Sequence, residues 1–289
     1  MKKNRHLQKN ARNDLLPWLK LVSNPVPQPV ARLRDSFSHT HTHHEPRNSN
    51  FNLASIPSRT ESLHEVILSL LPQADIINVY LNGFEGVPEF LYHPKIQYYK
   101  SQDEVGDLGD AGKFYRVASL SGYIFTVDDD LIYPPDYAET MIRNIDRFKR
   151  RAVITCHGRL FHCGRPVESI YTDFAEAFSC LKYTHEAFIH LPGTGVTAFH
   201  SDTCLPPLNT FKASNMADVW MALFCQKKKI PVFCIQHPAK WIRESQKHDR
   251  HYTIWNFCHA DDSFQTEQIN SIKNWKLHAC EDTLHHTGL

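Results

Sequence analysis

The sequence predicts an α/β fold in which a central, mostly parallel sheet is flanked by helices. Short apolar and β-branched runs, typical of strands, alternate with segments whose apolar residues recur at helical spacing. The chain opens strand, helix, strand over residues 51–81, and a crossover of this kind joins parallel strands. At 289 residues with a hydrophobic share of 42%, the chain has enough apolar side chains for one large core.

Residues 1–50 differ in composition from the rest and are expected to form a partly flexible extension. Basic residues gather at 2–12, prolines at 25–29 and histidines at 39–44. The histidine run has no fixed surroundings that would orient it as a metal site. Contact of the basic arm with anionic lipid at the inner membrane remains an alternative.

The first part of the expected domain contains three strands and one helix. The run Phe51–Pro57 predicts the first strand, and apolar residues at helical spacing over 63–71 predict a helix that Pro72 ends. Residues 76–81 are the second expected strand, and residues 95–99 are a short third one.

A glycine-bearing loop at residues 106–115 leads into an expected helix at 117–120. Glycines ahead of a helix let the backbone approach a phosphate or a sugar closely, and Lys113 would add positive charge there. The loop is neither a Walker loop nor a GxGxxG loop, so a plain flexible loop is an equal alternative.

Three acids follow directly after the apolar strand Tyr123–Val127: Asp128, Asp129 and Asp130. Open α/β sheets bind ligands at the carboxyl ends of their strands. Successive strand residues alternate in direction, so Asp128 and Asp130 are expected on one side and Asp129 elsewhere. Two carboxylates on one side suit Mg²⁺ or Mn²⁺, with substrate phosphates as further ligands. The alternative is a polar turn that caps the next helix.

The second part is less regular. Residues 160–190 show a poor pattern and are assigned to an insertion or to acceptor-side loops. Residues 191–195 are expected to form a tight glycine loop, which either faces a ligand or is a simple turn. Asp218 lies in the first turn of its helix, where capping alone would explain it. The expected elements are a helix at 137–148, strands at 152–156, 196–199 and 230–235, and a helix from 215–218 to 227–229.

The tail, residues 241–289, is polar, rich in histidine and aromatic, with a helix expected at 265–277. It is expected either to close over a ligand as a lid or to cover the sheet edge.

Charge and cysteine usage narrow the class of protein. The net charge of +1 offers no global field for nucleic acid. None of the eight cysteines forms a CxxC pair, and several lie in apolar runs, as reduced core thiols do. No stretch is apolar enough to span a membrane, and no signal-peptide core is visible. A cytoplasmic protein is expected, peripheral at the inner membrane at most.

Over residues 51–240 this order of motifs resembles the family-2-like glycosyltransferases of the A-type (GT-A) fold. Asp128-Asp-Asp130 resembles the DxD motif of that family, and Gly109–Lys113 resembles the loop that precedes it. Asp218 matches the position of the general base of inverting members, although Ala217 stands where the family commonly has Glu. The resemblance implies a single GT-A (Rossmann-like) domain, whose nucleotide-sugar half ends near residue 156 and whose acceptor-side half follows.

The resemblance also implies the site residues. Asp218 would be catalytic, and Mn²⁺ or Mg²⁺ would be held by Asp128, Asp130 and His237. The residues implied for the nucleotide sugar are Ser55, Pro57, Arg59, Asn82, Asp110, Lys113, Asp128 and Asp129.

The implied function is metal-dependent transfer of a sugar from a nucleotide sugar, a UDP-sugar, to a hydroxyl of a glycan or glycolipid acceptor. Inversion is expected, in the synthesis of surface polysaccharide such as capsule or lipopolysaccharide. A retaining glycosyltransferase would not need Asp218 as a base. A sugar nucleotidyltransferase would carry an early glycine-rich signature, which residues 55–59 lack. A binding module that has lost catalysis would lack the metal carboxylates.

Overall fold

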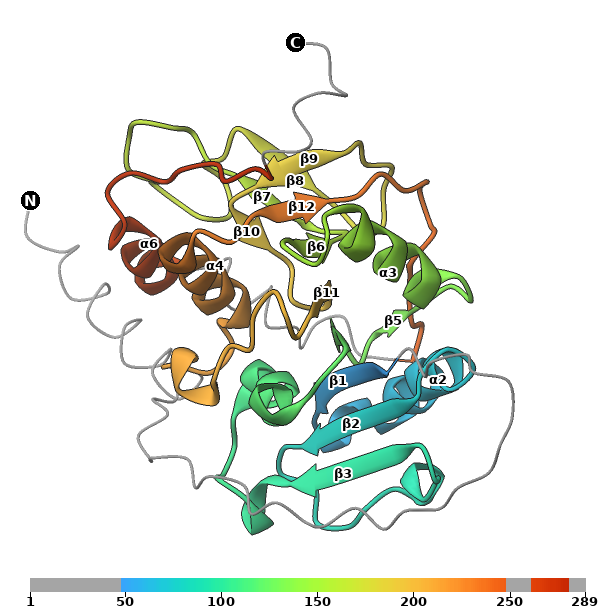
Figure 1. The fold of residues 1–289 in the computed structure, drawn as a ribbon. Coiled ribbons are helices and arrows are strands. Elements are labelled where there is room, and N and C mark those ends of the chain that lie inside the picture. The colour runs from blue at the N-terminus through green and yellow to red at the C-terminus, as the bar shows by residue number, and fades with distance from the viewer. Residues whose placement is uncertain (1–47, 248–260, 281–289) are drawn as a thin grey trace, which may run out of the picture.

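The computed structural model describes residues 48–247 and 261–280, which form an α/β arrangement around one large sheet (Figure 1). Most of the expected extension, residues 1–47, lies outside the described residues, and the first strand begins at Ser49. The strands of the large sheet are β1 (Ser49–Ser55), β2 (Ile76–Leu81), β3 (Ile96–Lys100), β4 (Tyr123–Val127), β6 (Val153–Thr155), β9 (Ala187–Ile189), β11 (Val196–His200) and β12 (Val232–Cys234).

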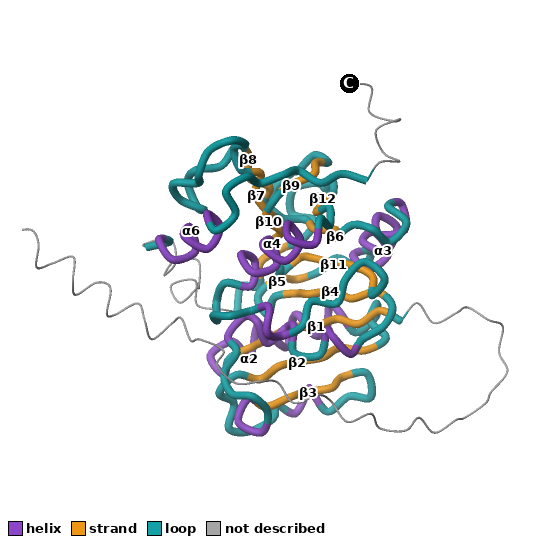
Figure 2. Tube along the Cα trace, turned by 60° about the vertical axis from the view of Figure 1, so that its left-hand side comes forward, coloured by secondary structure: helices purple, strands orange, loops and turns teal. Residues whose placement is uncertain are grey.

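The sheet has the order β3-β2-β1-β4-β11-β6-β12-β9 and is mixed, whereas the sequence predicted a mostly parallel sheet (Figure 2). Four of its seven pairings are parallel, and β11 runs antiparallel to both of its neighbours. The apolar pattern of a strand does not record the direction in which the strand runs. An antiparallel strand such as β11 can lie beside β4 without the crossover connection that a parallel neighbour needs. Its register sets Val196 opposite Val127, so residues just before β11 meet residues just after β4.

Helices cover both faces of the sheet. The helices α2 (Thr60–Leu70) and α3 (Tyr137–Arg147) pack into one apolar cluster with β1 and β2. On the other face, α4 (Ala217–Lys228) and the 3-10 turn η5 (Gly109–Phe114) belong to a second cluster. Burial on both faces explains why β4 is buried at every position and reads as a continuous apolar run.

Two expected helices differ from the structure. The glycine-bearing loop itself forms η5, and the helix expected after it is only a 3-10 turn, η6 (Val117–Ser119). The tail helix, α6 (Ser263–Asn270), ends seven residues earlier than expected, in a sequence with little amphipathic pattern. Helix α6 packs against α4.

Short strands lie in the irregular segment at 160–190 and at its margins. β7 (Gly158–Leu160), β8 (Glu176–Phe178) and β10 (Leu191–Pro192) form a small antiparallel sheet. Elsewhere, β5 (Leu131–Ile132) pairs with β13 (Arg243–Glu244). The remaining 3-10 turns are η2 (Pro57–Arg59), η3 (Glu89–Leu91), η4 (Ser101–Asp103) and η7 (Leu208–Thr210).

Within residues 48–247 and 261–280, no helix is long and apolar enough to cross a bilayer. None of the described cysteines forms a disulfide, and all of them except Cys163 are buried. Burial of this kind agrees with the core role that the sequence predicted for them.

Candidate functional site

The acidic motif lies where the order of the sheet reverses. β2 and β3 lie to one side of β1, and β4 lies to the other side, so the carboxyl ends of β1 and β4 are neighbours. Such a switch point is where open α/β sheets bind ligands. Ser55 ends β1 there, and its buried hydroxyl has no hydrogen-bond partner among the described residues.

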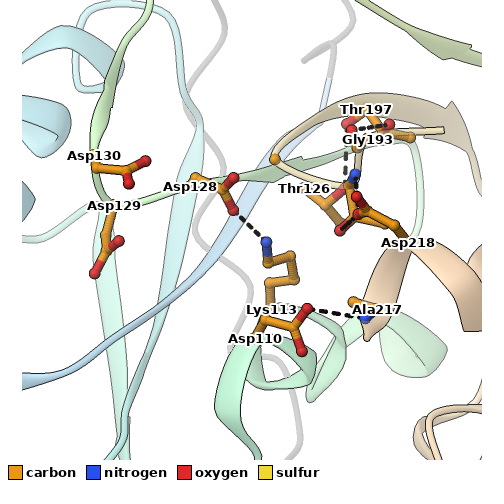
Figure 3. A network of polar contacts seen from close by, with 12 residues as sticks. Asp110, Lys113, Thr126, Asp128, Asp129, Asp130, Gly193, Thr197, Ala217 and Asp218 are labelled. Carbon is orange, nitrogen blue, oxygen red and sulfur yellow. Dashed lines mark hydrogen bonds and ion pairs between the residues drawn. The ribbon is translucent and has the colours of Figure 1, made fainter. Parts of the chain in front are cut away.

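Two cations contact the three acids. The Arg59 guanidinium, placed by η2, donates from Nη1 to Asp129 Oδ1 at 2.7 Å and to Asp130 Oδ2 at 2.9 Å. Lys113 Nζ, at the end of η5, pairs with Asp128 Oδ1. The expected alternation assumed an extended strand, but Asp129 and Asp130 lie in a turn after β4, where Arg59 bridges them. Asp128 is directed toward Lys113 instead (Figure 3).

The site carries more negative charge than its cations balance. Burial, and then the negative charges of Asp128 and Asp129, raise the pKa of Asp130 to about 7, against the opposing effect of Arg59. Burial by itself would lower the pKa of Lys113, but the carboxylates of Asp128 and Asp110 raise it. Burial by itself would also lower the pKa of the Arg59 guanidinium, but the carboxylates of Asp129 and Asp130 raise it. An additional cation would relieve this surplus of negative charge.

The chemistry of the donor set fits Mg²⁺ or Mn²⁺ shared with a substrate. The side chains of Asp128 and Asp130 are 39% and 21% exposed, so both carboxylates are accessible to a ligand. Within residues 48–247 and 261–280, no group of three His, Cys, Asp or Glu side chains is placed to hold a metal alone. Magnesium is commonly held by one or two carboxylates plus phosphate oxygens, which matches two available aspartates.

His237, the third expected ligand, makes contacts of a different kind. Its Nε2 lies 3.1 Å from the carbonyl oxygen of Cys156, and its Nδ1 lies 3.1 Å from that of Pro238. The buried ring also stacks against Trp241, with 5.7 Å between centroids. These contacts fix the imidazole against two backbone carbonyl oxygens, and none of them involves Asp128, Asp129 or Asp130. A ligand role for His237 stays a prediction that this arrangement does not favour.

Two residues expected to bind the nucleotide sugar hold the loop that carries Lys113. Asn82 Nδ2 donates to the carbonyl oxygen of Gly109 at 2.9 Å, and Asn82 Oδ1 accepts from the Leu108 N–H at 3.0 Å. Asp110 Oδ2 accepts from the Ala217 N–H at 2.9 Å, one of the free donors at the start of α4. Asn82 and Asp110 therefore join η5 to β2 and to α4.

Asp218 contacts the loop between β10 and β11 rather than the start of its own helix. Its Oδ1 accepts from the Thr194 N–H at 2.7 Å and from the Thr194 hydroxyl at 2.5 Å. No side chain of α4 caps that helix, and Asp110 contacts its first turn instead. Asp218 Oδ2 accepts no hydrogen bond within the described part of the chain, so it is available to take a proton.

Tyr133 and Gly195 support the site; no sequence signal pointed to Tyr133, and Gly195 lies in the loop for which a ligand-facing role was expected as often as a simple turn. The Tyr133 hydroxyl accepts from the Asp128 N–H at 2.8 Å and donates to the Gly195 carbonyl oxygen at 2.5 Å. A Cβ added to Gly195 would lie 1.8 Å from Asp128 Oδ2. The only sequence signal was the glycine loop itself, for which a simple turn was an equal alternative.

Replacing Gly195 with alanine is expected to displace the Asp128 carboxylate and to destabilise the fold by about 1–3 kcal/mol, as overpacking does. Gly86→Ala is the matched control, because a Cβ there meets nothing within 4 Å and Gly86 has no positive φ. Thermal unfolding of the two variants measures the difference. Equal unfolding temperatures would show that Asp128 does not need the space beside Gly195.

Asp110 is expected to make stability depend on pH. Burial raises its pKa from 3.8 to about 6, so the folded state binds a proton more readily than the unfolded chain. Stability from this group is therefore gained as pH falls from about 6 toward 3.8, by up to about 3 kcal/mol. Asp110→Asn keeps an oxygen for the Ala217 N–H and should remove this dependence.

The measurement for Asp110 is the difference in unfolding temperature between wild type and Asp110→Asn at pH 5 and at pH 8. The variant is expected to be relatively more stable at pH 8, where the buried wild-type carboxylate is charged. A difference that is the same at both pH values would contradict the shifted pKa.

Comparison with known proteins leaves the geometry as the basis for assigning function. No protein-family model matches the chain, and no curated protein matches it. The residues at the ends of β1 and β4, together with Asp218, carry the functional information in this chain.

Proposed function

We propose that the protein is a metal-dependent glycosyltransferase of the GT-A fold. It transfers a sugar from a nucleotide sugar, a UDP-sugar, to a hydroxyl of a glycan or glycolipid, with inversion at the transferred carbon. The observation that carries the proposal is the meeting of two acidic centres at one sheet edge. Asp128 after β4 lies against Gly195, and Asp218 of α4 accepts hydrogen bonds from the adjacent Thr194, so one loop joins the two centres. Lys113, which pairs with Asp128, lies between Asp128 and Asp218 (Figure 3).

The strand order supports the fold assignment. β3-β2-β1-β4 is the order of the first part of doubly wound nucleotide-binding sheets, with the ligand at the reversal between β1 and β4. The orphan hydroxyl of Ser55 and the acids of β4 lie at that reversal. A nucleotide bound there would have hydrogen-bonding and charged groups on both sides.

The donor half would work through charge. Asp128 and Asp130 would hold Mg²⁺ or Mn²⁺, which when bound neutralises charge on the diphosphate leaving group. Arg59 and Lys113 now contact these carboxylates, so they lie close enough to add positive charge to the same diphosphate. Surface polysaccharide remains the expected destination of the product.

The acceptor half would need one base. Asp218 Oδ2 takes the proton of the acceptor hydroxyl, and the acceptor oxygen forms a bond to the anomeric carbon. The bond from that carbon to the diphosphate breaks, and the diphosphate leaves with the electron pair. Thr194 fixes the carboxylate through Oδ1, which leaves Oδ2 for this proton. One displacement inverts the configuration of the carbon.

Calorimetric titration of UDP, GDP and CMP into the protein, with Mn²⁺ and with EDTA, tests the donor site. Binding of one nucleotide that needs the metal would support the proposal and identify the donor class. If none of the three binds in the presence of Mn²⁺, the acids after β4 are a polar turn and the proposal fails.

A further inference from the structure

Arg159 is a cation that forms no ion pair with any carboxylate of the described residues. It lies in β7, which pairs with β10, and its guanidinium carbon is 5.0 Å from the ring centre of Tyr171 and 5.9 Å from that of Phe174. Among the described residues, no carboxylate forms an ion pair with it and no side-chain hydrogen bond to it is found. Its five N–H donors are therefore available to a ligand.

The charge of Arg159 costs free energy to bury, and its surroundings differ from those of the nearby Arg165. Burial lowers the pKa of Arg159, and the carboxylate of Asp218 is the largest opposing influence, ahead of Tyr171 and Asp262. In the next segment Arg165 holds Asp173 with two hydrogen bonds, at 2.7 and 2.5 Å. A partly buried cation that lacks such a partner costs free energy, and groups of this kind mark functional sites.

The aromatic residues beside Arg159 lie on a segment that α6 anchors. Ser169 Oγ donates to Asp262 Oδ2 at 2.5 Å, and the Ile170 N–H donates to Thr266 Oγ1 at 3.1 Å. Asn270 exchanges hydrogen bonds with the backbone of Val167 at 2.9 and 2.7 Å. The segment is thus held in place before any ligand binds, which lowers the entropy cost of binding.

We propose that Arg159 binds an acidic group, a carboxylate or a phosphate, on the acceptor sugar whose hydroxyl Asp218 deprotonates. The inference rests on the proposed function and adds the substrate class, an anionic glycan. A planar guanidinium matches both anions through two parallel hydrogen bonds. β7 pairs with β10 and sets Arg159 opposite Leu191, three positions before the Thr194 that binds Asp218, which assigns Arg159 to the acceptor rather than to the diphosphate.

Saturation-transfer NMR with single sugars tests the proposal, using methyl glucuronoside, glucose 6-phosphate and neutral methyl glucoside as probes. Wild type is expected to bind at least one acidic probe about 10- to 100-fold more tightly than the neutral probe. The two acidic probes separate a carboxylate site from a phosphate site. Equal binding of all three probes would overturn the proposal.

Three variants sharpen the test. Arg159→Met should lose the preference while keeping binding of methyl glucoside, and Arg159→Lys should keep part of it, because the charge remains without the fork. Arg143→Met, which removes one exposed charge from α3, should leave the preference intact. A preference that survives in Arg159→Met overturns the proposal.

Thermal unfolding separates this role from a structural one. Met can fill the space between Tyr171 and Phe174 without an unpaired charge, so Arg159→Met should unfold at the same or a higher temperature. A lower unfolding temperature with loss of all sugar binding would mean that Arg159 is structural. The nucleotide titration is independent: if UDP binds with Mn²⁺ but acids are not preferred, only this inference fails. If acids are preferred but no nucleotide binds, the proposed function fails.

Discussion

Replacement of Asp218 by asparagine is expected to lower the kcat of sugar transfer by about 10²- to 10⁴-fold and to leave nucleotide binding unchanged. Asparagine keeps an oxygen that can accept both hydrogen bonds from Thr194, so the side chain should stay in place. The amide cannot take a proton from the acceptor hydroxyl at neutral pH. The measurement is the rate of UDP release in the presence of acceptor, alongside calorimetric nucleotide affinity.

Thr194→Val is the matched control for this loss. It removes the hydroxyl that donates to Asp218 but keeps the N–H that donates to the same oxygen. Transfer should fall by about tenfold, because the base is less firmly oriented but still present. If Asp218→Asn retained most of its turnover, Asp218 would not be the base and a retaining mechanism would gain support.

Replacement of Asp130 by asparagine is expected to weaken Mn²⁺-dependent nucleotide binding by about 100-fold, as loss of a charged metal ligand does. Asp130 has an exposed side-chain fraction of 21%, against 6% for Asp129, so it is the more available of the two carboxylates that Arg59 contacts. The measurement is UDP affinity as a function of Mn²⁺ concentration. Binding to Asp130→Asn should no longer rise with the metal.

Asp129→Asn is the matched control, because it removes one charge from the same guanidinium contact. In each variant Arg59 keeps one carboxylate partner, so the two should have similar stability. Asp129→Asn is expected to weaken UDP binding less and to keep its dependence on Mn²⁺. Identical metal titrations for the two variants would contradict the assignment of Asp130 as the ligand.

Local patterns predicted most of the parallel part of the fold. The strand at Tyr123–Val127 has the bounds that its composition predicted, and so does the strand at Ile76–Leu81. These strands depend on a few adjacent residues and on burial from both faces, and their apolar and β-branched side chains indicate that burial. The position of the three acids at the end of β4 followed from the same short-range information.

The sequence did not predict the direction of β11 or the partners of the site residues. Tyr133 lies 62 positions from Gly195, and Asp110 lies 107 positions from Ala217. Asp110 holds the start of α4, a contact that the sequence did not predict, and its role toward the nucleotide sugar stays a prediction. No periodicity or composition records a contact at that separation, since either partner would look the same in a turn or on the surface.

The sequence by itself therefore determined the α/β class, the carboxyl-end position of Asp128, Asp129 and Asp130, and the first-turn position of Asp218. Only the tertiary structure decided that β11 runs antiparallel to β4 and sets Gly195 against Asp128. It also decided which cation pairs with which acid, and that Arg159 has no acidic partner among the described residues. Strands and helix starts arise from neighbours in the chain, whereas ion pairs and close backbone contacts arise from register and packing between distant segments.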